Sequence, residues 1–205
     1  MTASGHGPEP DAQTGPVVAL PVYHGVSELE LGLMVTVLRL CGGDKVAVTV
    51  NRSRISVITA GGLVMTPHVL YAALPEPQAL LLPGGPGAAK AARAPLLRAF
   101  LAAHPGLPTG ASGSGLLLLG EAGTLDGRVV GGPTDLADTL WGFTPADVRP
   151  GQVVTDGRLC TTPAGLGALH AALHVAASLW GQDVARDAAE RIGSAPLLVG
   201  SVSVN

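Results

Sequence analysis

The sequence predicts an α/β protein built on a parallel sheet. Short apolar segments typical of buried strands alternate along the chain with segments of helical periodicity, as in repeated βαβ units. The clearest of the apolar segments, over 78–82, is continuous rather than alternating, which is typical of a central strand buried on both faces. The length of 205 residues suits a single domain.

The N-terminal half is predicted to begin with a buried strand and an amphipathic helix. In the helix, apolar residues recur at the three- and four-residue spacing of one face. The stripe consists of Leu29, Leu33, Val37 and Leu40. In order, the predicted elements are a strand at 16–22, the helix at 27–40, β-rich segments at 45–50 and 55–59, a turn at Gly61-Gly62, and the strand at 78–82, which ends at the PGGPG of 83–87.

The C-terminal half is predicted to continue the alternation with longer helices. A hairpin is expected around Asp156-Gly157, and Gly181 is expected to cap the long helix before it. The predicted elements are a helix at 94–104, a strand at 108–111, a helix at 115–122, the hairpin at 153–160, and helices at 165–180 and 183–192. Without repeats or linkers, we expect one domain at 16–193, a disordered leader at 1–15 and a C-terminal tail at 194–205.

Charge and composition narrow the classes of partner. The net charge is −3, the isoelectric point is about 6.0 and there is no basic run, so neither nucleic acid nor an anionic membrane is an expected partner. Apolar stretches are interrupted well before the ~20 residues of a membrane span. The polar leader lacks the features of a signal peptide, and a cytoplasmic location is predicted.

No spacing in the chain predicts a metal or an organic cofactor. Cys41 and Cys160 have neither metal-site spacing nor a disulfide framework and are expected to be reduced, buried thiols. His170 and His174 are one helical turn apart, but no third ligand is evident, so a packed helix face is the simpler interpretation.

The segment around Gly113 reads as a strand end, a sharp turn of small residues and a helix start. Such an elbow usually presents one reactive side chain at a helix N-terminus, where backbone N–H groups stabilise negative charge. Here the residue at the apex has no side chain. Ser112 and Ser114 flank the apex, and a serine hydrolase stays open as a minor alternative, although no histidine or lysine stands at a fixed spacing to activate either hydroxyl.

Ligands of open parallel sheets bind at the carboxyl ends of the strands, where the elbow is expected to meet two other segments. Glu30 flanks the apolar stripe of the first helix; a buried carboxyl there could exchange a proton near neutral pH, although acidic residues also simply favour the first helical turn. Gly84 and Gly85 can direct N–H groups at an oxyanion, or merely form a tight turn. His24 lies beside the same predicted cleft.

Together these segments resemble the ThiJ/PfpI superfamily of class I glutamine-amidotransferase-like proteins, and especially its isonitrile-hydratase-like branch. The resemblance covers about residues 16–192 and keeps the order of the family's motifs. The matching stretches are YHGVSELE at 23–30, LLPGG at 81–85, GLLLLGEAGTLDGR at 115–128, and DGRLCTT at 156–162 leading into AALH at 171–174.

The resemblance implies a flavodoxin-like sandwich with a mostly parallel central sheet and helices on both faces, usually dimeric, with the active site near the interface. The family's acidic residue matches Glu30, whose carboxyl hydrogen-bonds the nucleophilic cysteine in the family. That cysteine's position falls on Gly113. A histidine of many members falls on Pro133, and an aspartate of the family falls on His170 if one residue is deleted before it.

Without the thiol, the amidase, protease, deglycase and hydratase chemistry of the family cannot be carried over. Cys160 lies in the hairpin and is not expected to substitute. We also expect the missing side chain to widen the pocket, with Met34, Trp141 and Phe143 along it.

The favoured prediction is a cofactor-independent enzyme of a specialised biosynthetic pathway that acts on a small organic molecule by hydration, dehydration, isomerisation, cyclisation or carbon–carbon condensation. Glu30 would be its general acid/base, and the backbone N–H groups of Gly84, Gly85 and Ser114 would hold a developing oxyanion. The expected substrate-binding residues are His24, Gly84, Gly85, Gly113, Ser114, Pro133 and His170. The alternative is a non-catalytic small-molecule sensor of the same fold. A homodimer is expected in either case.

Overall fold

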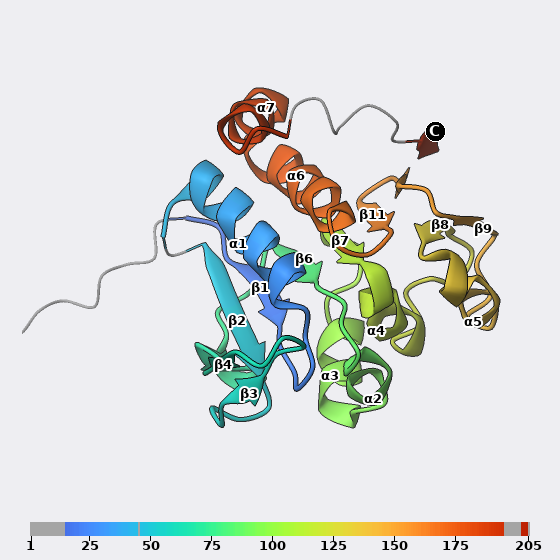
Figure 1. The fold of residues 1–205 in the computed structure, drawn as a ribbon, viewed down its shortest axis with the longest axis horizontal. Coiled ribbons are helices and arrows are strands. Elements are labelled where there is room, and N and C mark those ends of the chain that lie inside the picture. Colours follow the sequence, from blue (N-terminus) through green and yellow to red (C-terminus); the bar gives the residue numbers. More distant parts are fainter. Residues whose placement is uncertain (1–14, 45, 195–201, 205) are drawn as a thin grey trace, which may run out of the picture.

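The computed structural model describes residues 15–44, 46–194 and 202–204. At its centre is an eight-stranded sheet in the order β12-β10-β11-β7-β6-β1-β2-β5 (Figure 1). The strands are β1 (Val18–Pro21), β2 (Ala47–Asn51), β5 (Val69–Leu70), β6 (Ala79–Leu82), β7 (Thr109–Ser112), β10 (Val154–Asp156), β11 (Leu159–Thr162) and β12 (Val202–Val204). Every adjacent pair is parallel except β10 and β11. The predicted, mostly parallel sheet is confirmed.

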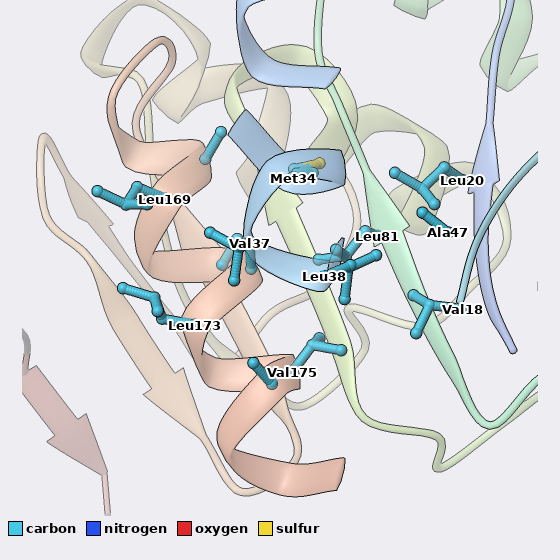
Figure 2. Close-up of a cluster of buried hydrophobic side chains, with 14 of the residues drawn as sticks. Val18, Leu20, Met34, Val37, Leu38, Ala47, Leu81, Leu169, Leu173 and Val175 are labelled. Atoms are coloured by element: carbon cyan, nitrogen blue, oxygen red, sulfur yellow. The ribbon is translucent and has the colours of Figure 1, made fainter. Parts of the chain in front are cut away.

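Helices cover both faces of the sheet (Figure 1). One layer consists of α1 (Glu28–Gly42), α6 (Gly167–Trp180) and α7 (Gln182–Arg191), and the other of α2 (Ala88–Ala92), α3 (Pro95–Ala102) and α4 (Leu116–Glu121). In Figure 2, Leu38 of α1 lies beside Leu81 of β6, and Val37 of α1 lies against α6. This three-layer arrangement is the α/β sandwich that the sequence predicts.

The core is made of small aliphatic side chains, as the 3% aromatic content requires. Glycine permits the closest approach between the layers. A Cβ on Gly110 of β7 would lie 2.7 Å from the carbonyl oxygen of Ala171 in α6. Any larger residue at position 110 would therefore push α6 off the sheet.

Short elements account for what the sequence did not predict. A satellite unit at one end of the molecule pairs β8 (Val129–Gly132) with β9 (Asp147–Pro150) in parallel, with η3 (Thr134–Leu136) and α5 (Ala137–Trp141) between them. A separate hairpin pairs β3 (Val57–Ile58) with β4 (Val64–Met65). Its first strand and its turn at Gly61-Gly62 were predicted, but β4 was not. The short helix α2 and the turn η1 (Tyr71–Ala73) were unforeseen, whereas η2 (Gly113–Gly115) lies at the predicted sharp turn. Elements of two to five residues are too short to show a period.

Most of the predicted leader over 1–15 and much of the predicted tail over 194–205 lie outside the described residues. Within the tail, β12 is described, and it pairs in parallel with β10. None of the helices described is long and apolar enough to cross a lipid bilayer.

The order in which strands join the sheet reverses at β1. The chain places β2 and β5 on one side of β1, and it later returns to place β6 on the other side. A sheet opens a crevice at such a switch point, outside the carboxyl ends of the strands. The segments that follow β1 and β6, residues 22–27 and 83–87, border this crevice. The residues of the predicted site follow these strands and their parallel neighbours β7 and β11, except for Pro133, which follows β8.

Candidate functional site

The elbow forms at the end of β7, and its apex is Gly113. The backbone there has φ +56°, a conformation that side-chain-bearing residues rarely adopt, and it leads through η2 into α4. A Cβ on Gly113 would lie 3.0 Å from the Cβ of Ala164 and 3.1 Å from Oε1 of Glu30. The apex therefore presents only backbone, and its surroundings are close-packed.

Glu30 reaches this elbow from the first turn of α1. Ser27 caps the helix, its hydroxyl accepting the N–H of Glu30 at 3.3 Å. A serine at the N-cap and a glutamate three residues later usually form a capping box, in which the glutamate turns back to the N-cap N–H. Here the Ser27 N–H donates instead to the Gly84 carbonyl at 2.8 Å, which leaves the Glu30 carboxylate for other partners.

The Glu30 carboxylate joins two distant loops. Its Oε2 accepts the Gly84 N–H at 2.7 Å, and its Oε1 accepts the Gly165 N–H at 2.9 Å. The side chain is only 3% exposed, so the predicted burial is confirmed. Both oxygens of the carboxyl group therefore accept a backbone N–H. Glu30 thus ties α1 to the loop after β6 and to the loop before α6, beside the elbow.

The glycines after β6 are held by neighbouring groups of the protein. Gly85 has φ +134°, and a side chain there would collide with the carbonyl of Gly25. Its N–H donates to the Ser114 hydroxyl at 2.9 Å, and that hydroxyl donates back to the Gly85 carbonyl at 2.9 Å. The N–H groups of Gly84 and Gly85, expected to face an oxyanion, are instead bonded to Glu30 and Ser114. This corrects the expectation for these two donors, while a role for the N–H of Ser114, the third donor expected there, stays a prediction.

Both serines of the elbow are engaged as hydrogen-bond donors. Ser112 is fully buried and donates to the Pro163 carbonyl at 3.1 Å. Ser114 donates to Gly85 as described above. A hydroxyl that donates to a backbone carbonyl has no base to receive its proton, so this geometry does not favour the serine-hydrolase alternative.

Tyr23, in the segment after β1, lines a cavity that the elbow residues do not line. Its hydroxyl donates to the Pro83 carbonyl at 2.7 Å. Burial raises the pKa of Tyr23, and the negative charge of Glu30 raises it further. The phenol is therefore a neutral, fixed donor at neutral pH.

The cavity beside Tyr23 has a volume of about 260 Å³ and is named here the tyrosine pocket. His24, the first histidine proposed for ligand binding, lines it. The other polar or aromatic side chains around it were not foreseen. They are Tyr23, Asn51, Arg52, Tyr71 and Lys90. The signal was present in the sequence, because Asn51 and Arg52 directly follow the β-rich segment predicted at 45–50, and ligand-binding residues gather at the carboxyl ends of strands in a parallel sheet.

His170 does not join this group. It lines a second cavity of about 260 Å³, between α6, α7 and the β10–β11 hairpin, together with Cys160 and His174. Burial raises the pKa of the Cys160 thiol to about 12. Burial lowers the pKa of His174, against a smaller opposing effect of its hydrogen bond to the Arg158 backbone. Across the described ranges, no three metal-ligating side chains are close enough to hold an ion.

The remaining expectations for the pocket need correction or stay predictions. Met34 is fully buried between α1 and the sheet (Figure 2), so it does not line a cleft. Phe143 packs over Gly120 of α4, and Trp141 is half-exposed on α5. Pro133 follows β8, whose last residue, Gly132, lies against Leu116 of the elbow helix. A contact of Pro133 with ligand stays a prediction. Cys160 pairs in register with Gly110 and does not replace the elbow thiol.

Comparison with known proteins gives a consistent result. The chain matches the DJ-1/PfpI family over residues 17–175. No curated protein matches it. A ThiJ/PfpI family protein from Pseudomonas syringae is 26% identical, with a TM-score of 0.80, over 96% of this chain and 82% of that one. A cysteine-to-alanine mutant of a DJ-1 superfamily protein from Salmonella typhimurium is 27% identical, with a TM-score of 0.72, over 87% and 98%. Drosophila melanogaster DJ-1beta, 21% identical over 89% and 100%, shares the fold with a TM-score of 0.80.

Proposed function

The chain belongs to the DJ-1/PfpI family, and we propose that it is a member that binds a small organic molecule without thiol chemistry and without converting it. The observation that carries this proposal is the hydrogen bonding between the elbow and the loop after β6. The hydroxyl of Ser114 accepts the N–H of Gly85 and donates to its carbonyl. An enzyme with an oxyanion hole at this position would keep that N–H free for the substrate.

The lost thiol and the occupied N–H groups support the same conclusion. The resemblance assigns covalent chemistry to a cysteine at position 113, which is glycine in this chain. An oxyanion hole works through donors that are preorganised and unpaired before the reaction. Here a substrate oxygen would have to displace Ser114 from Gly85, or Glu30 from Gly84, and each displacement would leave a buried polar group without a partner.

Glu30 has a structural role in this proposal. Its two hydrogen bonds hold the loops after β6 and before α6 at the carboxyl end of the sheet. A rigid rim of this kind fixes the shape of a binding site before the ligand arrives, which lowers the entropic cost of binding. Glu30 therefore positions the binding site and does not take part in a reaction.

The test is to follow binding and conversion in the same samples. The protein is incubated with a panel of small carboxylates, amides, aldehydes and isonitriles, and the melting temperature and ligand mass are recorded together. We expect at least one compound class to raise the melting temperature while its mass stays unchanged over hours. A product that forms with wild-type protein and not with buffer would contradict the proposal.

A second candidate is the cofactor-independent enzyme, and the position of Glu30 favours it. Each carboxylate oxygen receives one described hydrogen bond and keeps a lone pair, and Oε1 lies 3.1 Å from where a Cβ of residue 113 would stand. A placed proton acceptor contributes ~10²–10⁴-fold in rate, enough for an intrinsically easy hydration or isomerisation. In that case Glu30→Gln would abolish conversion, while Glu28→Gln, a matched change two residues earlier, would leave it intact.

We also propose a homodimer formed through the β3–β4 hairpin. Five large apolar side chains cluster on the hairpin and the adjoining start of α1, and they are between 52% and 73% exposed. They are Leu29, Ile55, Ile58, Leu63 and Val64. Exposed apolar clusters of this kind mark association surfaces. Light scattering should give a dimer for the wild type and a monomer for Val64→Asp, and a monomeric wild type would refute the proposal.

The cytoplasmic location and the isonitrile-hydratase-like branch stay predictions.

A further inference from the structure

We infer that the tyrosine pocket is a recognition site for a small organic anion with a planar apolar ring, of which an aromatic carboxylate is the simplest example. This inference rests on the proposed function and adds the location and the ligand class. The evidence is the position of the pocket in the sheet, the signs of the charges around it, the direction of its hydrogen-bonding groups, and its aromatic walls.

The position of the pocket is that of a ligand site in a parallel sheet. Residues that directly follow three neighbouring parallel strands line it: Tyr23 and His24 after β1, Arg52 after β2 and Tyr71 after β5. Lys90 of α2 closes it from the side. The pocket therefore opens at the carboxyl edge of the sheet, beside the switch point between β1 and β6.

The charges around the pocket have one sign. Arg52 and Lys90 line it, and no aspartate or glutamate is among the described residues that do so. Within the described part of the chain, the ion pairs involve other residues, so neither cation is neutralised by a carboxylate. The whole chain carries a net charge of −3, so this local excess of positive charge opposes the overall balance. A concave surface with unpaired cations attracts anions.

The neutral polar groups also present donors. The Nδ1 of His24 accepts the N–H of Ile58 at 3.2 Å, so the neutral imidazole carries its proton on Nε2. The Oδ1 of Asn51 accepts the Arg52 N–H at 2.6 Å, so the remaining polar group of this side chain is its NH₂ donor. With the guanidinium and the ammonium, four side chains can donate to one ligand. A carboxylate, which only accepts, matches that set.

The walls of the pocket are aromatic and rigid. The ring of Tyr71 stacks on Phe100 with centroids 4.9 Å apart and an interplanar angle of 27°. Tyr23 is held by its bond to Pro83. Leu96 and Leu97 add apolar surface. Drug-sized ligands occupy cavities of ~300–1,000 Å³, so a volume of about 260 Å³ suits a ligand with about one ring.

The experiment compares ligands of the same shape and different charge. Isothermal titration calorimetry on the full chain at low ionic strength would use benzoate, benzamide and benzylamine as anionic, neutral and cationic probes, with phenyl phosphate as a second anion. We expect benzoate to bind at least about tenfold more tightly than benzamide, because it adds charge-assisted hydrogen bonds. Benzylamine should not bind. Phenyl phosphate tighter than benzoate would identify the anion as a phosphate, within the same ligand class.

Variants locate the binding. Arg52→Gln and Lys90→Gln should each weaken benzoate by about tenfold and leave benzamide unchanged. Arg54→Gln is the matched control, because Arg54 is an exposed arginine two residues away that does not line the pocket. Tyr71→Leu should weaken the binding of benzoate and benzamide alike, because it removes the tyrosine ring that both ligands are expected to contact.

Equal affinity for benzoate and benzamide would overturn the inference, as would benzoate binding that is indifferent to Arg52 and Lys90. These failures differ from failure of the proposed function. A ligand that binds elsewhere and is recovered unchanged would refute only the tyrosine pocket. Conversion of a bound compound into product would refute binding without turnover, and the anion preference would stand.

Discussion

Replacing Glu30 by glutamine tests whether its carboxylate holds the elbow region together. The substitution keeps size and shape but changes one acceptor oxygen into an NH₂ group. In the structure both oxygens accept backbone N–H groups, from Gly84 at 2.7 Å and from Gly165 at 2.9 Å. Glutamine can satisfy only one of them, and its NH₂ must then face the other N–H, donor against donor.

The expected loss of stability follows from these two contacts. A hydrogen bond to a charged group contributes about 1.5–3 kcal/mol, and a buried donor left without a partner costs about 1–3 kcal/mol. The two figures overlap, because they describe the same lost bond, so we expect the free energy of unfolding to fall by about 2–4 kcal/mol. At roughly 2–4 °C per kcal/mol for a chain of this size, the melting temperature should fall measurably.

The assay is urea unfolding followed by the fluorescence of Trp141 and Trp180 and by circular dichroism. The midpoint should shift while the slope of free energy against urea stays constant. Glu28→Gln is the control, since Glu28 lies in the same helical turn but is more exposed and accepts the Gly61 N–H at 3.0 Å. Its effect should be much smaller. Equal effects of the two variants, or an unchanged stability of Glu30→Gln, would refute the clamp.

Three further predictions address other parts of the chain. Gly113→Ala should lower the free energy of unfolding by about 1–3 kcal/mol, because a side chain at φ +56° is strained. Gly32→Ala, at an exposed helical position with open space around it, should raise the free energy of unfolding by about 0.5–1 kcal/mol. Chemical denaturation that gave both changes the same sign would contradict the structure. Burial lowers the pKa of His174 in the folded state, so the unfolded chain binds a proton more readily and stability is lost as the pH falls below about 6.5. His174→Gln should therefore lose less stability than the wild type between pH 7 and pH 5. Identical pH profiles of stability would show that His174 does not cause this loss. Burial raises the pKa of the Cys160 thiol to about 12, so a thiol reagent at pH 8 should label half-buried Cys41 faster than Cys160 in the folded protein and both equally in urea, whereas rapid native labelling of Cys160 would contradict its burial.

The fold was predictable because its signals are local. The position of α1 follows from its apolar spacing and from Ser27 and Glu30 at its start, and β6 follows from an apolar run that stops at Pro83. The predicted stripe of Leu29, Leu33, Val37 and Leu40 was wrong as the buried face, because Leu29 is 54% exposed. The buried residues of α1 are Glu30, Leu31, Met34, Val37 and Leu38. The segment from β8 to β9 was not predicted, because its strands of four residues contain glycine and proline and show no period.

The candidate site was predictable as a set of segments but not as a set of bonds. The sequence places Glu30, Gly84 and Gly113 at the carboxyl ends of adjacent strands. Which N–H donates to which oxygen depends on how distant segments pack. Glu30 is 54 positions from Gly84 in the sequence and 135 positions from Gly165, and no local pattern encodes such contacts. For the same reason the sequence could not show that the Gly85 N–H donates to the Ser114 hydroxyl, or that His170 lines the cavity beside the β10–β11 hairpin.

Amide hydrogen exchange at Gly84 and Gly85, measured by NMR on the ligand-free protein, tests most directly whether these two N–H donors of the loop after β6 are already hydrogen-bonded within the protein. The bonds to Glu30 and Ser114 predict that both amides exchange as slowly as amides in the neighbouring strands, and that Ser114→Ala releases Gly85 alone. Exchange of both wild-type amides at the rate of an unstructured peptide would show that the donors are free, and would contradict binding without catalysis.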